Sequence, residues 1–324
     1  MGLFDFLRGA PPVRLWTAED DPVIARLRRA EELGDWQEVA RFLSGLSLTD
    51  ERAYCVNTLS NSRAPLWFFE SWVKAEPERA DAWLSRGCRY VDWAWEARGE
   101  GTADTVEEDG WPLFFERLQR AWSDFDTAAE LAPNDPLPHA EQIGCAIGLQ
   151  MGDEAASACF EEVTRRDQEC WAAHSRMLAQ KCKKWGGSHD EMFEFARSTS
   201  AASPDGSGLH ALIAEAHFER WLYRFAFEGD KESSGRYWDD PQVREELVAA
   251  HRQSLGSDRF RGGAWDLPRR NMFACLLALA GAHSEAASEF DKIGNTPDEW
   301  PWQFFGKPLQ AYARLRKGSF KHRQ

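Results

Sequence analysis

Three of the eight histidines recur at a nearly constant interval along the chain. His174 follows His139 by 35 residues, and His210 follows His174 by 36. Imidazoles titrate near pH 6.5, so three of them on one surface would form a partly cationic strip that favours carboxylates, more strongly at lower pH. Each histidine could instead cap a helix or pack near its start. The spacing alone leaves both interpretations open.

A fourth histidine raises the question of a metal site. His210 and His217 lie seven residues apart, on one face of a helix, with Glu215 and Glu219 close by. Such a group could in principle bind zinc. A zinc-protease motif has two histidines four residues apart, and this group lacks that spacing. It also offers no assured third ligand. We therefore predict no metal ligand and no other cofactor.

Cysteine and glycine patterns give no catalytic motif. Cys170 lies four residues before His174, but the seven cysteines include no CxxC pair and most stand among apolar neighbours. Buried, reduced thiols are the prediction. The sequence also contains no GxSxG, P-loop or GxGxxG motif, and Gly262-Gly263 follows no strand. We predict no catalytic residue and a non-enzymatic protein.

The composition favours helices over strands. Ile, Val and Thr together account for 24 of the 324 residues, too few for the half-buried faces of a sheet. The chain carries 39 Lys and Arg against 53 Asp and Glu, a net charge of −14. Phosphate binding draws on clustered cations, so this balance excludes a general nucleic-acid-binding protein. We expect an all-α, acidic protein.

The ends of the chain carry no targeting signal. The first eight residues lack the basic start of a signal peptide, and Phe6 stands where N-myristoylation requires Ser or Thr. The longest apolar run, 272–282, is shorter than the roughly 18 residues that span a membrane. We expect a soluble, cytoplasmic protein without integral membrane association, and leave its oligomeric state open.

Apolar residues at helical spacing alternate with polar segments along the whole chain. Two acidic, glycine-containing segments, 99–110 and 229–240, are predicted to be exposed inserted loops, and a basic tail covers 314–324. Helices are predicted at residues 19–33, 36–45, 50–60, 65–75, 79–98, 111–131, 137–150, 154–166, 169–184, 189–201, 208–228, 241–255, 269–281, 284–293 and 301–316.

Part of this pattern repeats. Gly152 and Phe160 recur as Gly187 and Phe195 at an offset of 35 residues, and residues 272–293 align with 142–163 at an offset of 130. A period near 34 residues is typical of tetratricopeptide repeats. Small residues at fixed places, such as Ala156, are expected where two helices approach closely. The proline-containing segments 131–136 and 201–205 are predicted repeat boundaries.

The spacing of Ala156 and Phe160, repeated in Ala286 and Phe290, resembles the tetratricopeptide helix-turn-helix. The segment 184–188, KWGGS, looks like a turn of an uncharacterised bacterial family with a tetratricopeptide-like fold and a domain of unknown function. These resemblances imply antiparallel helix pairs stacked as an irregular right-handed solenoid, in a single domain over 1–324 with its clearest repeats at 137–300.

In tetratricopeptide repeats, certain positions of the first helix line a concave groove. This resemblance places the three recurring histidines at the second position, with Arg269 in the copy at offset 130. The Lys/Asn clamp of domains that hold chaperone tails is absent, and apolar members such as Ile143 and Phe273 could equally be core. The groove candidates that the resemblance implies are His139, Gln142, His174, Met177, Lys181, His210, His217 and Arg269.

Sixteen tryptophans could serve packing or binding. Trp93 and Trp95 are about 200° apart on a helix, so one is expected in the core and the other exposed or under a loop. Trp300 and Trp302 could pack against the last helix. Arg89, Tyr90 and Trp93 could form a platform for a glycan or peptide, because aromatic and Arg side chains dominate binding hot spots.

The leading hypothesis is a non-enzymatic helical scaffold that binds a protein or peptide partner, one bearing a carboxylate if the histidine strip is accessible. The alternative is a small-molecule-binding or enzymatic pocket, formed where the inserts fold over the groove. A closed cavity walled by His174, His210 and His217 would favour the alternative. A purely oligomerising role is a third hypothesis.

Overall fold

The structure, a computed structural model, describes residues 12–60, 65–99, 106–107, 109–229 and 235–323. In these ranges the chain forms α-helices and short 3-10 turns but no strand, which confirms the all-α prediction. The sequence predicts one continuous domain, and the contacts group the chain into two compact units. Unit 1 comprises 1–20 and 196–324, unit 2 comprises 21–195, and each is described by itself.

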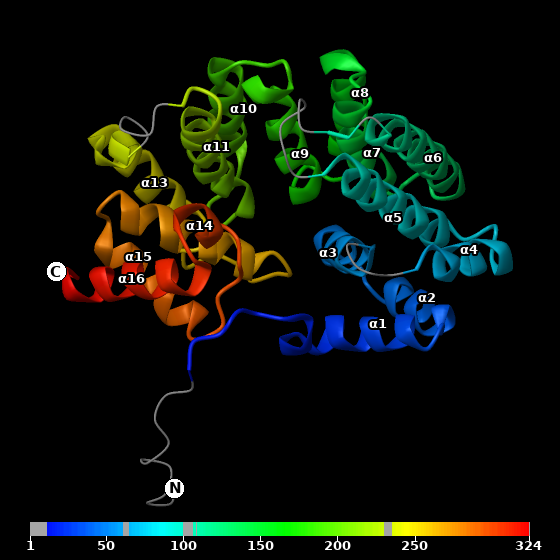
Figure 1. Cartoon of the computed structure of the whole chain (residues 1–324), viewed down its shortest axis with the longest axis horizontal. Coiled ribbons are helices and arrows are strands. Elements are labelled where there is room, and N and C mark those ends of the chain that lie inside the picture. Colours follow the sequence, from blue (N-terminus) through cyan, green and yellow to red (C-terminus); the bar gives the residue numbers. More distant parts are fainter. Residues whose placement is uncertain (1–11, 61–64, 100–105, 108, 230–234, 324) are drawn as a thin grey trace, which may run out of the picture. The chain divides into compact units, whose positions relative to one another are not determined.

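The described residues of unit 2 are mostly α-helical (Figure 1). The helices are α1 (Pro22–Glu32), α2 (Trp36–Ser44), α3 (Thr49–Ser60), α4 (Leu66–Ala75), α5 (Ala80–Arg98), α6 (Gly110–Leu131), α7 (Leu137–Gly148), α8 (Gly152–Thr164), α9 (Trp171–Lys181) and the first part of α10 (His189–Ala202).

Local sequence explains where these helices begin. Asp21 accepts hydrogen bonds from the backbone N–H groups of Val23 and Ile24 at the start of α1, and Pro22 occupies the first helical position. Asp35 caps α2 in the same way. Gly34, just before it, has φ = +70°, a conformation that side chains disfavour. Aspartate and glycine therefore position the α1–α2 turn.

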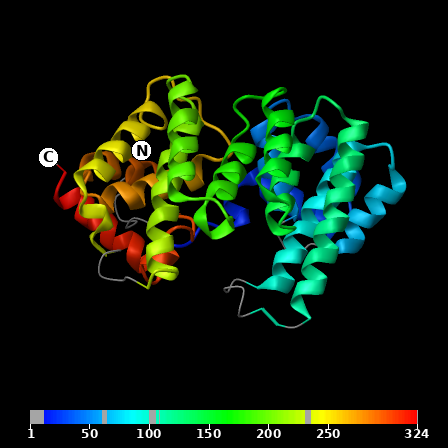
Figure 2. The same ribbon diagram turned by 90° about the horizontal axis from the view of Figure 1, so that it is seen from above.

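The helices of unit 2 pack in a regular order. Most successive helices contact each other, from α4 through α9 and α1 with α2, and most extensively α5 with α6, which lie side by side in Figures 1 and 2. Alternate helices also touch in series, α1 with α3, α3 with α5, α5 with α7, and α7 with α9. Ala156 on α8 is fully buried, as expected for a small residue where helices approach closely.

Unit 1 contains the rest of α10, the turn η4 (Gly208–Ala211), α11 (Leu212–Ala226), η5 (Tyr237–Asp239), α13 (Pro241–Gln253), α14 (Asp266–Leu279), α15 (His283–Ile293), η6 (Trp302–Phe305) and α16 (Pro308–Lys321). Helices α14, α15 and α16 contact one another. Their core is aromatic, because the rings of Phe290, Trp302 and Tyr312 lie 5.1 to 5.8 Å apart and are fully buried.

Two predicted helices are interrupted in the structure. The range 208–228 begins as a 3-10 turn, η4, because the Ser207 side chain caps the backbone N–H of Leu209. The range 301–316 is split at Gly306, and Pro308 then starts α16 at its N-terminal turn. Much of the predicted basic tail is accordingly helical, since α16 continues to Lys321.

The predicted inserts fall partly outside the described residues, at 100–105, 108 and 230–234. The prediction that 229–240 is an exposed loop is wrong for its described end, because Trp238 in η5 is buried. All seven cysteines are free and buried, as predicted. Among the helices that the structure describes, none is both long and apolar enough to cross a membrane.

Replacing Gly87 by alanine is expected to destabilise unit 2. An added Cβ would lie 2.5 Å from the fully buried ring of Phe125, and overpacking of this kind costs roughly 1–3 kcal/mol. Gly144→Ala is the matched control, because its Cβ would meet only the flexible Arg176 side chain at 3.6 Å. Alanine there should gain about 0.5–1 kcal/mol of helix propensity. Urea unfolding should therefore give opposite signs, and equal effects would contradict the α5–α6 packing.

Candidate partner-binding surfaces

One side of the α5–α6 pair combines aromatic rings with arginines. Tyr90 and Trp93 lie one turn apart on α5, and their rings are stacked with centroids 6.4 Å apart. From α6, the guanidinium carbon of Arg117 lies 3.6 Å from the centre of the Trp93 ring. Arg120 and Arg86 lie 5.9 Å from the Tyr90 ring. We call Arg86, Tyr90, Trp93, Arg117 and Arg120 the α5–α6 face.

The arginines of this face differ in whether a carboxylate pairs with their charge. Arg86 donates two hydrogen bonds to Asp124, and Arg120 pairs with Glu116 at 2.7 Å. In the described part of the chain, the only hydrogen bond of Arg117 goes to the backbone oxygen of Trp93, at 2.6 Å. Partial burial lowers the pKa of Arg117. Arg117 is thus a half-buried cation, held flat on an indole, without a bound carboxylate.

The predicted platform residue Arg89 has a different role. It is 8% exposed, and its Nη1 donates to Asp92 at 2.7 Å and to Glu96 at 3.1 Å. Burial raises the pKa of Asp92 to about 6, with a contribution from the neighbouring Glu96 and against the charge of Arg89. Arg89 therefore binds its own helix rather than extending into solvent. The prediction that Arg89 lies on a platform for a partner does not agree with this burial.

Trp93 and Trp95 are both half-buried, so the expected division into one core and one exposed ring is wrong. Trp95 packs edge-on against Phe114 at 4.9 Å and Trp185 at 5.8 Å. The two rings point to different sides of α5, and each side has its own neighbours. Arg117 covers Trp93 on the α5–α6 face, and the aromatic side chains of Phe114 and Trp185 pack against Trp95.

Most groove candidates of unit 2 form hydrogen bonds or ion pairs with other residues of the same unit. His139 is half-buried, with Nδ1 2.9 Å from Oε1 of Gln142, and the buried Gln142 donates to Asp126. His174 is 5% exposed, and its Nδ1 donates to the Cys170 carbonyl at 2.9 Å. Burial lowers the pKa of His174, which opposes a cationic role. Two further candidates are also engaged: Met177 is buried, and Lys181 pairs with Asp153 at 2.7 Å.

The candidates of unit 1 are buried as well. His210 is 1% exposed, and its two nitrogens lie 2.8 Å from the Ser200 hydroxyl and 3.0 Å from the Pro204 carbonyl. Arg269 is 6% exposed and packs against Gly208, where a Cβ would approach its guanidinium carbon to 2.7 Å. The idea of an accessible histidine strip is therefore corrected: His174, His210 and Arg269 are core side chains at or near helix starts. Their burial removes the reason for expecting that strip to bind carboxylates.

His217 contacts the C-terminal part of the second insert, residues 229–240. It is 3% exposed, its Nδ1 lies 2.7 Å from the Tyr237 hydroxyl, and its Nε2 lies 3.1 Å from Glu246. This arrangement resembles a catalytic relay, but burial raises the pKa of Tyr237, which makes the phenol harder to ionise. The hydrogen bond to His217 lowers the pKa of Glu246 to about 2, against its burial. The relay serves to attach η5 to α11 and α13.

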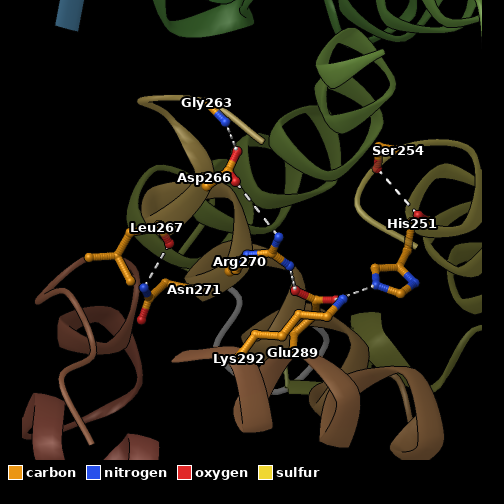
Figure 3. A network of polar contacts seen from close by, with 9 residues as sticks. All are labelled: His251, Ser254, Gly263, Asp266, Leu267, Arg270, Asn271, Glu289 and Lys292. Carbon is orange, nitrogen blue, oxygen red and sulfur yellow. Dashed lines mark hydrogen bonds and ion pairs between the residues drawn. The ribbon is translucent and has the colours of Figure 1, made fainter. Parts of the chain in front are cut away.

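A second buried network links side chains of α13, α14 and α15 (Figure 3). The carboxylate of Glu289 is fully buried and contacts His251 at 3.0 Å, Arg270 at 2.6 Å and Lys292 at 2.7 Å. Arg270 also pairs with Asp266 at 3.7 Å. Burial alone would raise the pKa of Glu289, but the hydrogen bonds from His251 and Lys292 and the charge of Arg270 lower it to about 2. The network joins α13, α14 and α15 and has no exposed acid or base for catalysis at its centre.

Unit 1 also contains a cavity of about 690 Å³. Its walls come from η5, one side of α13 and the turn between α14 and α15. The lining residues are Trp238, Asp239, Asp240, Pro241, Arg244, Glu245, Val248, Ala249, Arg252, Leu279, Ala280, Gly281 and Glu285. Within the described residues, no group of three or more His, Cys, Asp or Glu side chains has an arrangement that could hold a metal ion.

Sequence reasoning found Trp93 but missed Arg117 and the cavity. Arg117 lies 24 residues after Trp93, beyond the first insert, and only the α5–α6 packing brings them together. The Trp and Arg residues that recur in both helices were the available signal. No protein-family model matches the chain, and a search among curated proteins finds none that is similar to it.

Proposed function

We propose that the protein is a non-enzymatic, tetratricopeptide-like scaffold that binds a partner protein through the α5–α6 face. The series of contacts between alternate helices of unit 2 supports stacked helix pairs, because each pair must bury its apolar side against the next. A scaffold of this kind presents side chains on rigid helices, which keeps the entropy lost on binding small.

The observation that carries the proposal is Arg117 on Trp93. A guanidinium presents five N–H donors in a fixed fork, and in the described structure a backbone carbonyl accepts from this one. Its stacking on the indole fixes its orientation before a partner arrives. Trp, Tyr and Arg are also the residues that contribute most to binding at protein interfaces. Tyr90 is itself buried, so the α5–α6 face combines a pre-oriented donor, Arg117, with the half-buried ring of Trp93.

The partner chemistry that fits is a carboxylate next to an apolar or aromatic side chain. A carboxylate can accept two parallel hydrogen bonds from a guanidinium. Unit 2 holds 19 Lys and Arg against 33 Asp and Glu, so the entire net charge of −14 lies in this unit, while unit 1 holds 20 of each. A long acidic segment would be repelled by the surrounding charge. One carboxylate, or the carboxyl end of a chain, is the better ligand.

Arg117→Gln is expected to abolish capture of the partner. The purified chain would be used to capture proteins from a lysate of the cells that produce it, in parallel with Arg117→Gln and Arg165→Gln. Arg165 is the matched control, an exposed arginine of α8 in the same unit that pairs with Glu162. Partners retained by wild type and Arg165→Gln should be lost with Arg117→Gln, with affinities reduced roughly 30-fold, as for a hot-spot residue. Equal capture by all three proteins would refute the proposal.

The alternative function is a small-molecule or enzymatic pocket, and the cavity of unit 1 is a candidate location for it. The expected walls of such a pocket were His174, His210 and His217, and none of these lines it. Its walls also lack an ordered pair of acid and base. The cavity is therefore better interpreted as a binding site than as a catalytic one.

A further inference from the structure

The cavity of unit 1 is formed along one side of α13. Arg244, Glu245, Val248, Ala249 and Arg252 recur every three or four residues, so they form a continuous stripe about 16 Å long with Pro241 at its beginning. Small and apolar residues of α13 and of the α14–α15 turn form the floor of the cavity, and charged residues form its rim. This shape fits an extended peptide segment lying along the helix.

The end of the insert completes the opposite rim. Tyr237 is held by His217, and the Trp238 ring lies 6.1 Å from the Trp221 ring of α11. Asp240 accepts from the backbone N–H of Gln242 and so begins α13. These contacts fix the positions of Asp239 and Asp240 at the rim, so the charges are placed there before a ligand binds.

The rim is acidic although unit 1 as a whole is neutral. Four carboxylates line the cavity, Asp239, Asp240, Glu245 and Glu285, against Arg244 and Arg252. Glu285 is already paired with Arg252 at 2.8 Å. In the described structure, Asp239 and Glu245 have no ion-pair or hydrogen-bonding partner for their side chains. The excess of acid is thus local to this cavity.

Trp238 adds an independent sign of a missing partner. Its side chain lines the cavity and is 4% exposed, and its indole Nε1–H has no acceptor among the described residues. Buried indole N–H groups ordinarily find an acceptor. A peptide offers backbone carbonyls as acceptors at every residue, whereas a simple organic amine offers none.

We propose that this cavity is a second binding site, which takes a peptide segment of a partner protein carrying Lys or Arg. The basic side chain pairs with Asp239 and Glu245, apolar neighbours of the segment cover Val248 and Ala249, and a backbone carbonyl accepts from Trp238. The site has the opposite charge preference to the α5–α6 face, so the two sites select different segments.

The test is the selection of a random 12-residue peptide library on the full chain, followed by affinity measurements on variants. Peptides enriched by wild type and eluted by competition should contain Lys or Arg beside apolar residues. Their affinity should fall on the order of tenfold for the double variant Asp239→Asn with Glu245→Gln, which removes two charge pairs. Ala249→Arg, which fills the cavity and lowers its excess of negative charge, should abolish their binding.

Controls separate this inference from the proposed function. The double variant Asp258→Asn with Glu299→Gln removes two exposed carboxylates of unit 1 outside the cavity, and Arg117→Gln disables the α5–α6 face. Both should bind the basic peptides like wild type. Thermal unfolding by circular dichroism checks that every variant is folded. Enrichment of acidic or neutral peptides alone, or binding insensitive to the cavity variants, would overturn the proposal. Binding of small organic amines with equal affinity would overturn it in favour of a small-molecule site.

Discussion

Glu289→Gln is expected to lower the free energy of unfolding of unit 1 by about 3–5 kcal/mol. The carboxylate is fully buried and contacts His251, Arg270 and Lys292, so its loss leaves the buried His251 and the part-buried Arg270 without their carboxylate partner. Because α13, α14 and α15 all contribute to this network, the whole of unit 1 should respond. Chemical denaturation followed by circular dichroism measures the change.

The matched control is Glu285→Gln, one turn earlier on α15. Glu285 pairs with Arg252, whose side chain is 69% exposed, so water replaces the lost contact and the expected effect is below about 1 kcal/mol. Similar losses for the two variants would show that burial of Glu289 does not strengthen its interactions.

The same group predicts how stability depends on pH. The pKa of Glu289 is lowered to about 2 from the ordinary glutamate value of 4.5, so the folded state holds the ionised form more strongly than the unfolded state does. The resulting stabilisation, roughly 3 kcal/mol, is present in full above pH 4.5 and is lost as the pH falls toward 2. Wild type should lose this amount over that interval, and Glu289→Gln should lack this part of the dependence. Parallel curves for the two proteins would contradict the assignment.

Trp302→Ala is expected to destabilise unit 1 by roughly 3–5 kcal/mol, the usual effect of removing a buried aromatic side chain. Trp302 is fully buried between Phe290 and Tyr312, and its Nε1 donates to Asn271 at 2.8 Å. The variant would leave a cavity and remove one of the two hydrogen bonds that the Asn271 Oδ1 accepts. Urea unfolding of the full chain should show the loss as a lower midpoint.

Phe227→Ala provides the comparison for a ring outside the core. Phe227 is 50% exposed at the end of α11, so its removal should change the stability of unit 1 by less than about 1 kcal/mol. A small effect of Trp302→Ala, close to that of Phe227→Ala, would mean that the aromatic core does not hold α14, α15 and α16 together.

The helices themselves could be predicted from the sequence. The pattern predicted helices at 79–98 and 111–131, and the structure has α5 at Ala80–Arg98 and α6 at Gly110–Leu131. Helix ends are local, since capping residues and prolines act within one turn. The errors at 208–228 and 301–316 occurred where a 3-10 turn replaces the first turns of the expected helix.

The candidate sites could be predicted far less well. The sequence suggested Trp93 as part of a platform with Arg89 and Tyr90, but Arg117 comes from another helix. The recurring histidines suggested an accessible strip, and three of the candidates, His174, His210 and His217, are buried. A histidine near a helix start has the same sequence pattern whether a neighbouring helix covers it or not. For His217 the covering residue is Tyr237, 20 positions away and beyond the second insert.

By itself, the sequence determined the all-α class, the positions of most helices, the reduced buried thiols and the acidic balance, because each depends on composition or on contacts within a few turns. Only the tertiary structure decided which polar and aromatic side chains are covered. The sequence of a helix does not show which of its sides a neighbouring helix will cover, because that neighbour comes from a distant segment. That packing assigned Trp302 to the core, placed Arg117 on Trp93, buried Glu289 beside His251, Arg270 and Lys292 and gathered the acidic rim of the unit 1 cavity.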